Sequence, residues 1–115
     1  MTDSCLFCKI VNREIPAAIV YEDSDILAFK DARAQAPVHL LIIPKTHIEK
    51  LSDFNKDNAE IFGRIILTAN KLAGENGIDS SGYRVVVNCG RDAGQAVFHM
   101  HAHLLGGRPM TWPPG

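Results

Sequence analysis

Three of the five histidines in this 115-residue chain, His99, His101 and His103, recur at every second position near its C-terminal end. On an extended strand alternate residues point to the same face, whereas a helix would scatter them around its axis. We therefore expect a strand that presents three imidazoles on one face and the intervening apolar residues on the other. Imidazole is nucleophilic and largely neutral near pH 7, and it is also a common metal ligand. The row therefore predicts either nucleophilic and acid–base catalysis or a metal site.

The segment before the histidines predicts a loop that can bind an anion. Gly90 and Gly94 give this loop the freedom to turn backbone N–H groups toward a ligand. The formal net charge is only −1, with both signs interspersed along the chain. A phosphate group would therefore have to be held locally, by imidazoles and backbone amides.

Composition limits the class of protein. A chain of 115 residues suits one domain, residues 1–115, and 46% hydrophobic with 22% charged residues is typical of a soluble globular fold. The balanced charge offers no basic surface for nucleic acid or an anionic membrane, and no apolar run approaches the ~20 residues that span a bilayer. The N-terminal residues lack the pattern of a signal peptide. We therefore expect no nucleic-acid or membrane partner and a cytoplasmic location.

Three cysteines are an odd count, which without an export signal argues against a disulfide framework. Two of them form Cys5-Leu6-Phe7-Cys8, which could be a redox pair, half of a zinc site or two unrelated thiols. A redox pair usually lies at a helix start after a strand, and no strand precedes this one. Zinc would need two further ligands, which the histidines could supply.

Hydrophobic periodicity predicts the elements that position these residues. Apolar residues at helical spacing predict a long helix over residues 56–73, which should cover one face of a sheet, and a short helix is expected over 7–13. The remaining segments predict an α+β domain with a five-stranded antiparallel sheet. Its strands are expected over residues 18–21, 26–30, 39–43, 83–88 and the histidine row.

The histidine row also resembles a known family. The run His99-Met100-His101-Ala102-His103-Leu104-Leu105 resembles the His-φ-His-φ-His-φ-φ signature of the histidine-triad (HIT) superfamily. The tail from 106 to 115 resembles the C-terminus of its Hint branch, which consists of nucleoside phosphoramidases. The similarity runs from about residue 5 to residue 115. Further matching segments are Glu14-Ile15-Pro16, Ala28-Phe29-Lys30-Asp31, Ala36-Pro37-Val38-His39 and Ile43-Pro44-Lys45-Thr46-His47.

The resemblance implies a covalent mechanism. His101 would attack the α-phosphorus of a nucleoside 5′-phosphoramidate, such as adenosine 5′-monophosphoramidate, and form a nucleotidyl-histidine intermediate that water hydrolyses. His103 would contact the phosphate oxygens, and His39 would help to orient the triad. Three alternatives stay open: a dinucleoside-polyphosphate hydrolase, a nucleotide-binding or scaffold protein with little turnover, and a metallohydrolase with an open metal site.

The resemblance also assigns residues to a purine nucleotide substrate. Asp31 matches the aspartate that hydrogen-bonds the ribose hydroxyls. Phosphate charge would be held by the Asn88 side chain and by backbone N–H groups around Gly94, Gln95 and Ala96. The positions that match the base pocket are Phe7, Ile10, Ile15, Phe29 and Ala32, although sequence alone favours an ordinary core for them.

Two residues depart from the family's pattern. Ala96 stands where the well-known Hint enzymes carry serine, whose hydroxyl assists the leaving group. Alanine keeps the backbone N–H but cannot relay a proton, so we expect slower turnover. Lys30 stands where relatives often carry histidine, which is expected to alter recognition at the base.

The resemblance further implies a metal and a partner. Superfamily members with an N-terminal Cys-x-x-Cys hold a structural zinc, and the matching ligands are Cys5, Cys8, His47 and His99. This set closes a tetrahedral zinc and leaves no open position, and no organic cofactor is implied. In the Hint branch the tail crosses a two-fold dimer, which implies a homodimer with a continued sheet. Trp112 would then shape selectivity for the leaving group, with a hydrophobic plug as the alternative.

Overall fold

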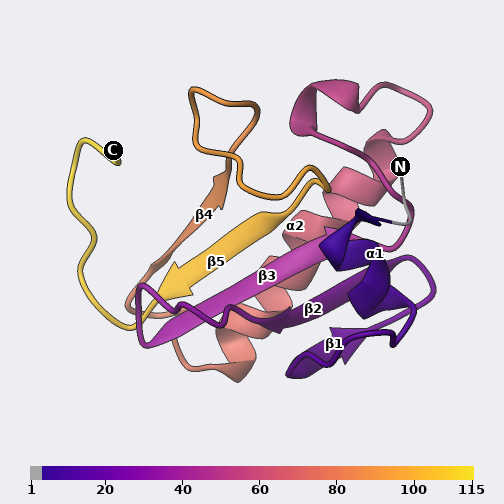
Figure 1. The fold of residues 1–115 in the computed structure, drawn as a ribbon. Coiled ribbons are helices and arrows are strands. Elements are labelled where there is room, and N and C mark those ends of the chain that lie inside the picture. The colour runs from indigo at the N-terminus through magenta and orange to yellow at the C-terminus, as the bar shows by residue number, and fades with distance from the viewer. Residues whose placement is uncertain (1–3) are drawn as a thin grey trace.

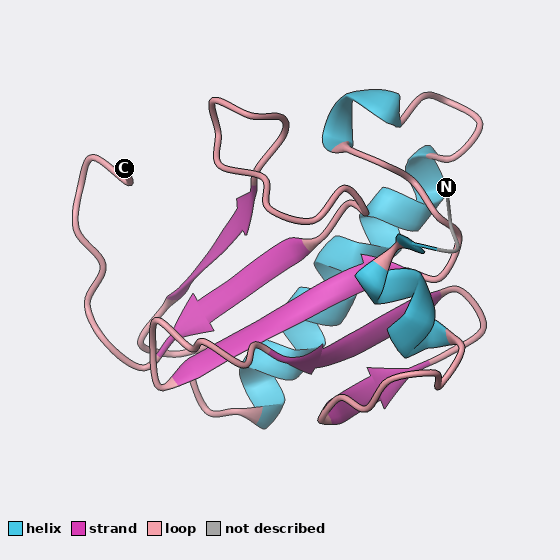
Figure 2. Ribbon diagram, viewed as in Figure 1, coloured by secondary structure: helices cyan, strands magenta, loops and turns pink. Residues whose placement is uncertain are grey.

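The computed structural model describes residues 4–115, which form a five-stranded sheet with helices on both faces (Figures 1 and 2). The strand order is β1-β2-β3-β5-β4, and every neighbouring pair is antiparallel. The predicted α+β fold with one long and one short helix is confirmed. The elements in chain order are α1 Leu6–Val11, β1 Ile19–Glu22, β2 Ile26–Lys30, β3 Val38–Pro44, the 3-10 helix η2 Leu51–Asp53, α2 Ala59–Glu75, β4 Tyr83–Val87 and β5 Ala102–Gly106.

The sheet separates two apolar clusters. On one face α2 buries Ile65, Ala69 and Leu72 against the sheet, and on the other α1 buries Phe7 and Ile10. Figure 1 shows the two helices on opposite sides of the strands. The apolar residues of the histidine row all lie in the α2-side cluster, as predicted: they are Met100, Ala102 and Leu104.

The histidine row is only partly a strand, so the prediction of one strand for all three histidines is wrong in extent. β5 begins at Ala102, which leaves His101 and His99 before it. The ladder with β3 stops because Pro44 has no N–H to donate, and the Met100 N–H instead donates to the carbonyl of Ile48 at 2.6 Å. The alternation of faces nevertheless continues through this segment.

The long helix is displaced from its predicted bounds. It begins at Ala59 rather than 56 because the preceding asparagines form a turn, in which the Asn58 Oδ1 accepts from the Asn55 N–H at 2.7 Å. It continues past Gly74 and ends where Gly77 adopts a positive φ of 71°. No helix within residues 4–115 has the length and apolar character needed to cross a membrane.

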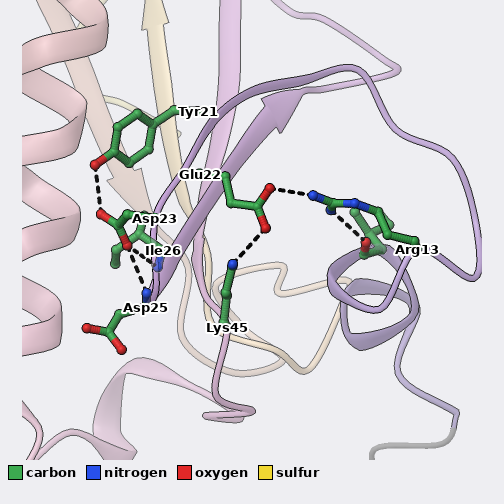
Figure 3. Close-up of polar contacts among 8 residues, drawn as sticks. Arg13, Tyr21, Glu22, Asp23, Asp25, Ile26 and Lys45 are labelled. Carbon is green, nitrogen blue, oxygen red and sulfur yellow. Dashed lines mark hydrogen bonds and ion pairs between the residues drawn. The ribbon is translucent and has the colours of Figure 1, made fainter.

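An ion-paired cluster joins the turn after α1, the β1–β2 hairpin and the residue that follows β3 (Figure 3). The Glu22 carboxylate accepts from Arg13 and, at 2.6 Å, from the Lys45 ammonium. The Asp23 carboxylate closes the hairpin turn by accepting the N–H groups of Asp25 and Ile26, each at 2.8 Å. The cluster thereby fixes the segment that leaves β3 toward His47.

Candidate active site

His101 is held in one tautomer by a backbone carbonyl. Its Nδ1 lies 2.8 Å from the carbonyl oxygen of His99. A carbonyl only accepts hydrogen bonds, so Nδ1 carries the ring proton and the lone pair is on Nε2. The residue is 7% exposed, and Phe7 packs edge-on against the ring with centroids 5.1 Å apart. The orientation of His101 and the nitrogen that carries its lone pair are therefore both defined.

A second chain of hydrogen bonds defines the tautomer of His103. The backbone N–H of Gln35 donates to His39 Nδ1 at 3.0 Å, so the proton of His39 is on Nε2. That nitrogen lies 2.9 Å from His103 Nδ1, which must therefore accept. The remaining proton of His103 is on Nε2. His39 therefore contacts one imidazole of the triad, and its expected role in orienting the triad rests on this contact.

Asp31 extends this chain. Its Oδ2 lies 3.3 Å from His39 Nε2, and its Oδ1 accepts the Arg33 N–H at 2.7 Å. Asp31, His39 and His103 place ligand atoms within 4.8 Å of one another, a spacing that would suit a metal. The tautomer argues against this use, since His39 Nε2 carries a proton and offers no lone pair. The three residues form a hydrogen-bonded unit instead.

Burial keeps the imidazoles of His39 and His103 neutral by lowering the pKa of each ring. Desolvation, followed by repulsion from His101 and His39, lowers the pKa of His103 to about 4. Desolvation also lowers the pKa of His39, against the opposing pull of Asp31. Near neutral pH the His103 side chain is therefore an uncharged hydrogen-bond donor.

A cavity of about 580 Å³ opens beside His101 and His103. It lies on the α1 face of the sheet, and its size falls in the range of small-molecule sites. The aromatic rings of Phe7 and Phe29, with centroids 5.4 Å apart, belong to its apolar wall. Because the resemblance predicts that residues of this wall bind a nucleotide, we refer to this space as the nucleotide cavity. The predicted residues that line it are Phe7, Ile10, Phe29, Lys30, Asp31, Ala32, Ala96, His101 and His103.

Other predicted residues lie outside the nucleotide cavity. Ile15 packs against the apolar cluster of the α1 face without lining the cavity. His39 and Asn88 line a second cavity, which shares His103 with the first. Trp112 is 82% exposed in the C-terminal tail, where its ring lies 6.0 Å from the Arg84 guanidinium. Trp112 is therefore not a plug of the core.

The loop before the histidines differs from its predicted role. The N–H of Gly94 donates to the Arg91 carbonyl at 2.9 Å, and that of Gln95 to the Gly90 carbonyl at 3.1 Å, so neither is free for a phosphate. The buried Gln95 side chain braces the loop by donating to the Glu49 and Val97 carbonyls. The Ala96 N–H, by contrast, has no hydrogen-bond partner within residues 4–115.

Several residues that line the nucleotide cavity were not predicted from the sequence. Leu41 could have been found, because it alternates with His39 along β3 and so shares its face. The small residues at 16–18 have no side-chain chemistry that would single them out. Gln35 could not be found from its side chain either, because it is its backbone N–H that donates to His39. The missed lining residues are Leu6, Pro16, Ala17, Ala18, Arg33, Leu41 and Val97.

The four predicted metal ligands also come together. Cys5, Cys8, His47 and His99 place their donor atoms within 4.8 Å of one another. The His99 Nε2 donates to the Pro44 carbonyl at 2.7 Å, which leaves the Nδ1 lone pair facing Cys5 Sγ at 3.3 Å. His47 Nδ1 lies 3.3 Å from Cys8 Sγ.

The chemistry of these donors fits a thiophilic cation. Burial, together with the hydrogen bond and charge of Cys5, raises the pKa of Cys8 to about 11, so this thiol resists ionising unless a cation lies beside it. Desolvation lowers the pKa of His99 to about 4, so its Nδ1 keeps a lone pair. Two cysteine sulfurs and two imidazole nitrogens make a closed tetrahedral set.

Comparisons with known proteins agree with this geometry. The HIT domain family matches residues 12–110. An uncharacterized HIT-like protein of Synechocystis is 50% identical over all of both chains, and the purine nucleoside phosphoramidase of Escherichia coli is 46% identical, covering 96% of this chain and 92% of that protein. The crystal structure of a HIT family hydrolase from Legionella pneumophila matches with a TM-score of 0.96 at 56% identity, over 97% of this chain and 100% of that one. This chain therefore belongs to the HIT domain family.

Proposed function

We propose that this protein is a nucleotide hydrolase that cleaves a nucleoside 5′-phosphoramidate into a nucleoside monophosphate and an amine. The observation that carries the proposal is the pair of tautomers at one cavity. The Nε2 of His101 has a lone pair, whereas the Nε2 of His103 carries a proton. One ring can attack phosphorus while the other binds a phosphate oxygen. The similarity to a protein named purine nucleoside phosphoramidase supports the substrate class.

The first step forms the bond from His101 Nε2 to the α-phosphorus and breaks the phosphorus–nitrogen bond of the substrate. The amine leaves with a proton, and the modified ring becomes a cation. The His99 carbonyl, which accepts from His101 Nδ1–H, stabilises that positive charge. In the second step water attacks phosphorus, the bond to Nε2 breaks, and the lone pair returns to His101.

The proton for the leaving amine comes from water or from the substrate. His103 keeps its single Nε2 proton because its partner His39 is itself held as a donor by the Gln35 N–H. Ala96 has no hydroxyl to relay a proton. His103 therefore acts as a positioned, neutral donor to the phosphate.

The rest of the nucleotide occupies the nucleotide cavity. The apolar wall around Phe7 and Phe29 suits a purine base, and the Asp31 carboxylate at the cavity suits the ribose hydroxyls. The Ala96 N–H, which has no partner among residues 4–115, is a backbone donor available to the phosphate. Gln95 supports the loop through its side chain rather than binding the ligand.

Zinc is the metal that we propose for the second cluster. It would be held by Cys5, Cys8, His47 and His99, and when bound it supplies structural cross-linking rather than an open coordination position. The His99 carbonyl also accepts the hydrogen bond of His101 Nδ1, so an ordered metal centre would help to fix the orientation of the His101 ring.

We also propose that two copies associate through β4. This strand lies at the edge of the sheet, and all its residues are partly buried in the single chain. An edge strand presents unpaired N–H and C=O groups to a second copy. Light scattering after size exclusion should give twice the chain mass of 12.6 kDa, whereas a monomer would contradict the association.

One set of assays tests the function. His101→Ala should abolish release of adenylate from adenosine 5′-phosphoramidate while nucleotide binding stays measurable by calorimetry. Near-wild-type turnover by this variant would overturn the mechanism. Faster hydrolysis of diadenosine polyphosphate would favour that class of substrate instead. Binding of adenylate without turnover of either substrate would indicate a nucleotide-binding protein.

A further inference from the structure

A second cavity, which we call the basic cavity, lies beside the nucleotide cavity and has a volume of about 260 Å³. Two arginines, Arg84 and Arg108, line it together with Asn88, His39 and His103. No acidic side chain lines it among the described residues. The nucleotide cavity, by contrast, is lined by a carboxylate, Asp31, as well as by the cations Lys30 and Arg33.

The register of the sheet places the two cavities side by side. His103 pairs with Leu41 on β3 and with Val86 on β4, so these three residues share one face. Leu41 lines the nucleotide cavity, Val86 lines the basic cavity, and His103 lines both. A ligand whose phosphate contacts His103 can therefore extend into either space.

The arginines of the basic cavity are held in place by carbonyl groups rather than carboxylates. The Arg84 guanidinium donates to the Thr111 carbonyl at 3.0 Å, and Arg108 Nε donates to the Gln35 carbonyl at 3.0 Å. Neither arginine forms an ion pair within residues 4–115. Three other arginines each pair with a carboxylate. These ion pairs are Arg13–Glu22, Arg64–Asp23, Arg64–Asp25 and Arg91–Asp92.

The remaining donors of these guanidinium groups can therefore bind an external anion. A guanidinium has five N–H donors, and the carbonyl contacts use only some of them. Two cations at one cavity that no acidic side chain of residues 4–115 lines favour a carboxylate or phosphate group over a neutral one.

We infer that the basic cavity is the leaving-group subsite and that it selects substrates whose leaving group bears an anion. The inference rests on the proposed function. With the nucleoside in the nucleotide cavity and His101 attacking phosphorus, the group in line with the attack departs on the far side of the phosphate. The basic cavity continues past His103 toward β4, away from the wall formed by α1. The anion can be the carboxylate of an amino acid or a second phosphoryl group.

Three adenosine phosphoramidates test the inference. They carry β-alanine, 2-aminoethylphosphonate or the neutral β-alaninamide as the leaving amine. The readout is the ratio of kcat/KM for each anionic substrate to kcat/KM for the neutral one, measured in wild type and in Arg84→Gln and Arg108→Gln. Each substitution should lower the ratio about tenfold, as expected for loss of one charge-assisted hydrogen bond. A drop confined to β-alanine would identify the anion as a carboxylate, and one confined to the phosphonate would identify it as a phosphoryl group.

Controls separate this inference from folding and from the proposed function. Arg91→Gln, which removes an exposed arginine paired with Asp92, should leave the ratio unchanged. Turnover of the neutral substrate reports that each variant is folded. Ratios unaffected by both substitutions in the basic cavity would overturn the inference while leaving the phosphoramidase function intact. No turnover of any of the three substrates by wild type would overturn both.

Discussion

The backbone carbonyl of His99 accepts the Nδ1–H of His101 at 2.8 Å, while the imidazole of His99 faces the thiol of Cys5 at 3.3 Å. His99 thus contributes its side chain to the proposed metal-ligand cluster and its backbone carbonyl to the hydrogen bond that orients the proposed nucleophile. The Pro44 carbonyl fixes the His99 ring from the opposite side at 2.7 Å. The proposed metal centre and the proposed nucleophile are therefore consecutive parts of one rigid arrangement.

Removing the metal should destabilise the fold. A ligand that binds only the native state contributes about 4 kcal/mol at 1,000 times its Kd, which corresponds to a fall in Tm of about 10 °C or more for a domain of this size. Chelation and Cys8→Ser should both produce this fall, measured by calorimetry with metal content from atomic absorption. Cys89→Ser is the matched control, because Cys89 lies outside the cluster. Equal Tm values for the two serine variants would contradict the assignment.

The tautomer of His103 should depend on His39. In His39→Leu the donor to His103 Nδ1 is lost, so the proton can move to Nδ1 and kcat should fall about 10- to 100-fold, the range of one lost transition-state donor. His39→Gln keeps an N–H donor and should lose less. Nitrogen-15 chemical shifts of His103 report the tautomer directly. The same shifts and kcat in wild type and the leucine variant would refute the hydrogen-bond chain.

Acid should lower stability through His103. Its pKa is about 4 in the folded protein against 6.5 for an unperturbed histidine, so the unfolded state binds more protons between these values. The free energy of unfolding should therefore fall as pH drops from about 6.5 to about 4, by up to about 3 kcal/mol from this group. Urea unfolding at several pH values measures the slope.

His103→Gln isolates this contribution. The variant lacks the titrating ring but keeps the metal-ligand cluster, so any acid effect on the ligands is common to both proteins. The slope of its unfolding free energy against pH should be smaller than that of wild type over this interval, and the difference should correspond to at most one bound proton. Parallel pH profiles for the two proteins would show that His103 titrates normally in the folded state.

Serine at position 96 should raise turnover. Ala96 lines the nucleotide cavity beside His101, and its side chain cannot supply a proton to the leaving amine. In Ala96→Ser a hydroxyl is added at that position while the backbone N–H is kept, and a positioned proton relay contributes about 10²-fold or more. We expect kcat to rise with an amine of high basicity and to change little with a good leaving group. An unchanged kcat for both amines would remove the role assigned to this position.

The sequence predicted this architecture well where residue type and spacing determine position. The alternation through the histidine row predicted that Met100 and Ala102 lie on the face opposite the imidazoles. The resemblance to the HIT superfamily matched Cys5 and Cys8 to His47 and His99, which lie up to 94 residues away along the chain. The loop could not be predicted in the same way. The N–H groups of Gly94 and Gln95 donate to carbonyl groups within the loop. Backbone hydrogen bonds of this kind do not depend on residue type, so the sequence does not reveal them.

The start of β5 at Ala102, after two of the three histidines of the row, has a similar explanation. Only the pairing partner reveals that Pro44 lies where the ladder would need an N–H. The basic cavity likewise depends on register, which brings Arg84 of the edge strand onto the face of His103. Non-local pairing therefore accounts for what the sequence left open.

Detection of the covalent intermediate tests the central claim most directly. Wild-type protein mixed with adenosine 5′-phosphoramidate, quenched rapidly in base and analysed by intact and peptide mass spectrometry should carry one adenylyl group on His101. His101→Ala should carry none. Rapid turnover without any adduct at early times, or an adduct on a residue other than His101, would contradict the account.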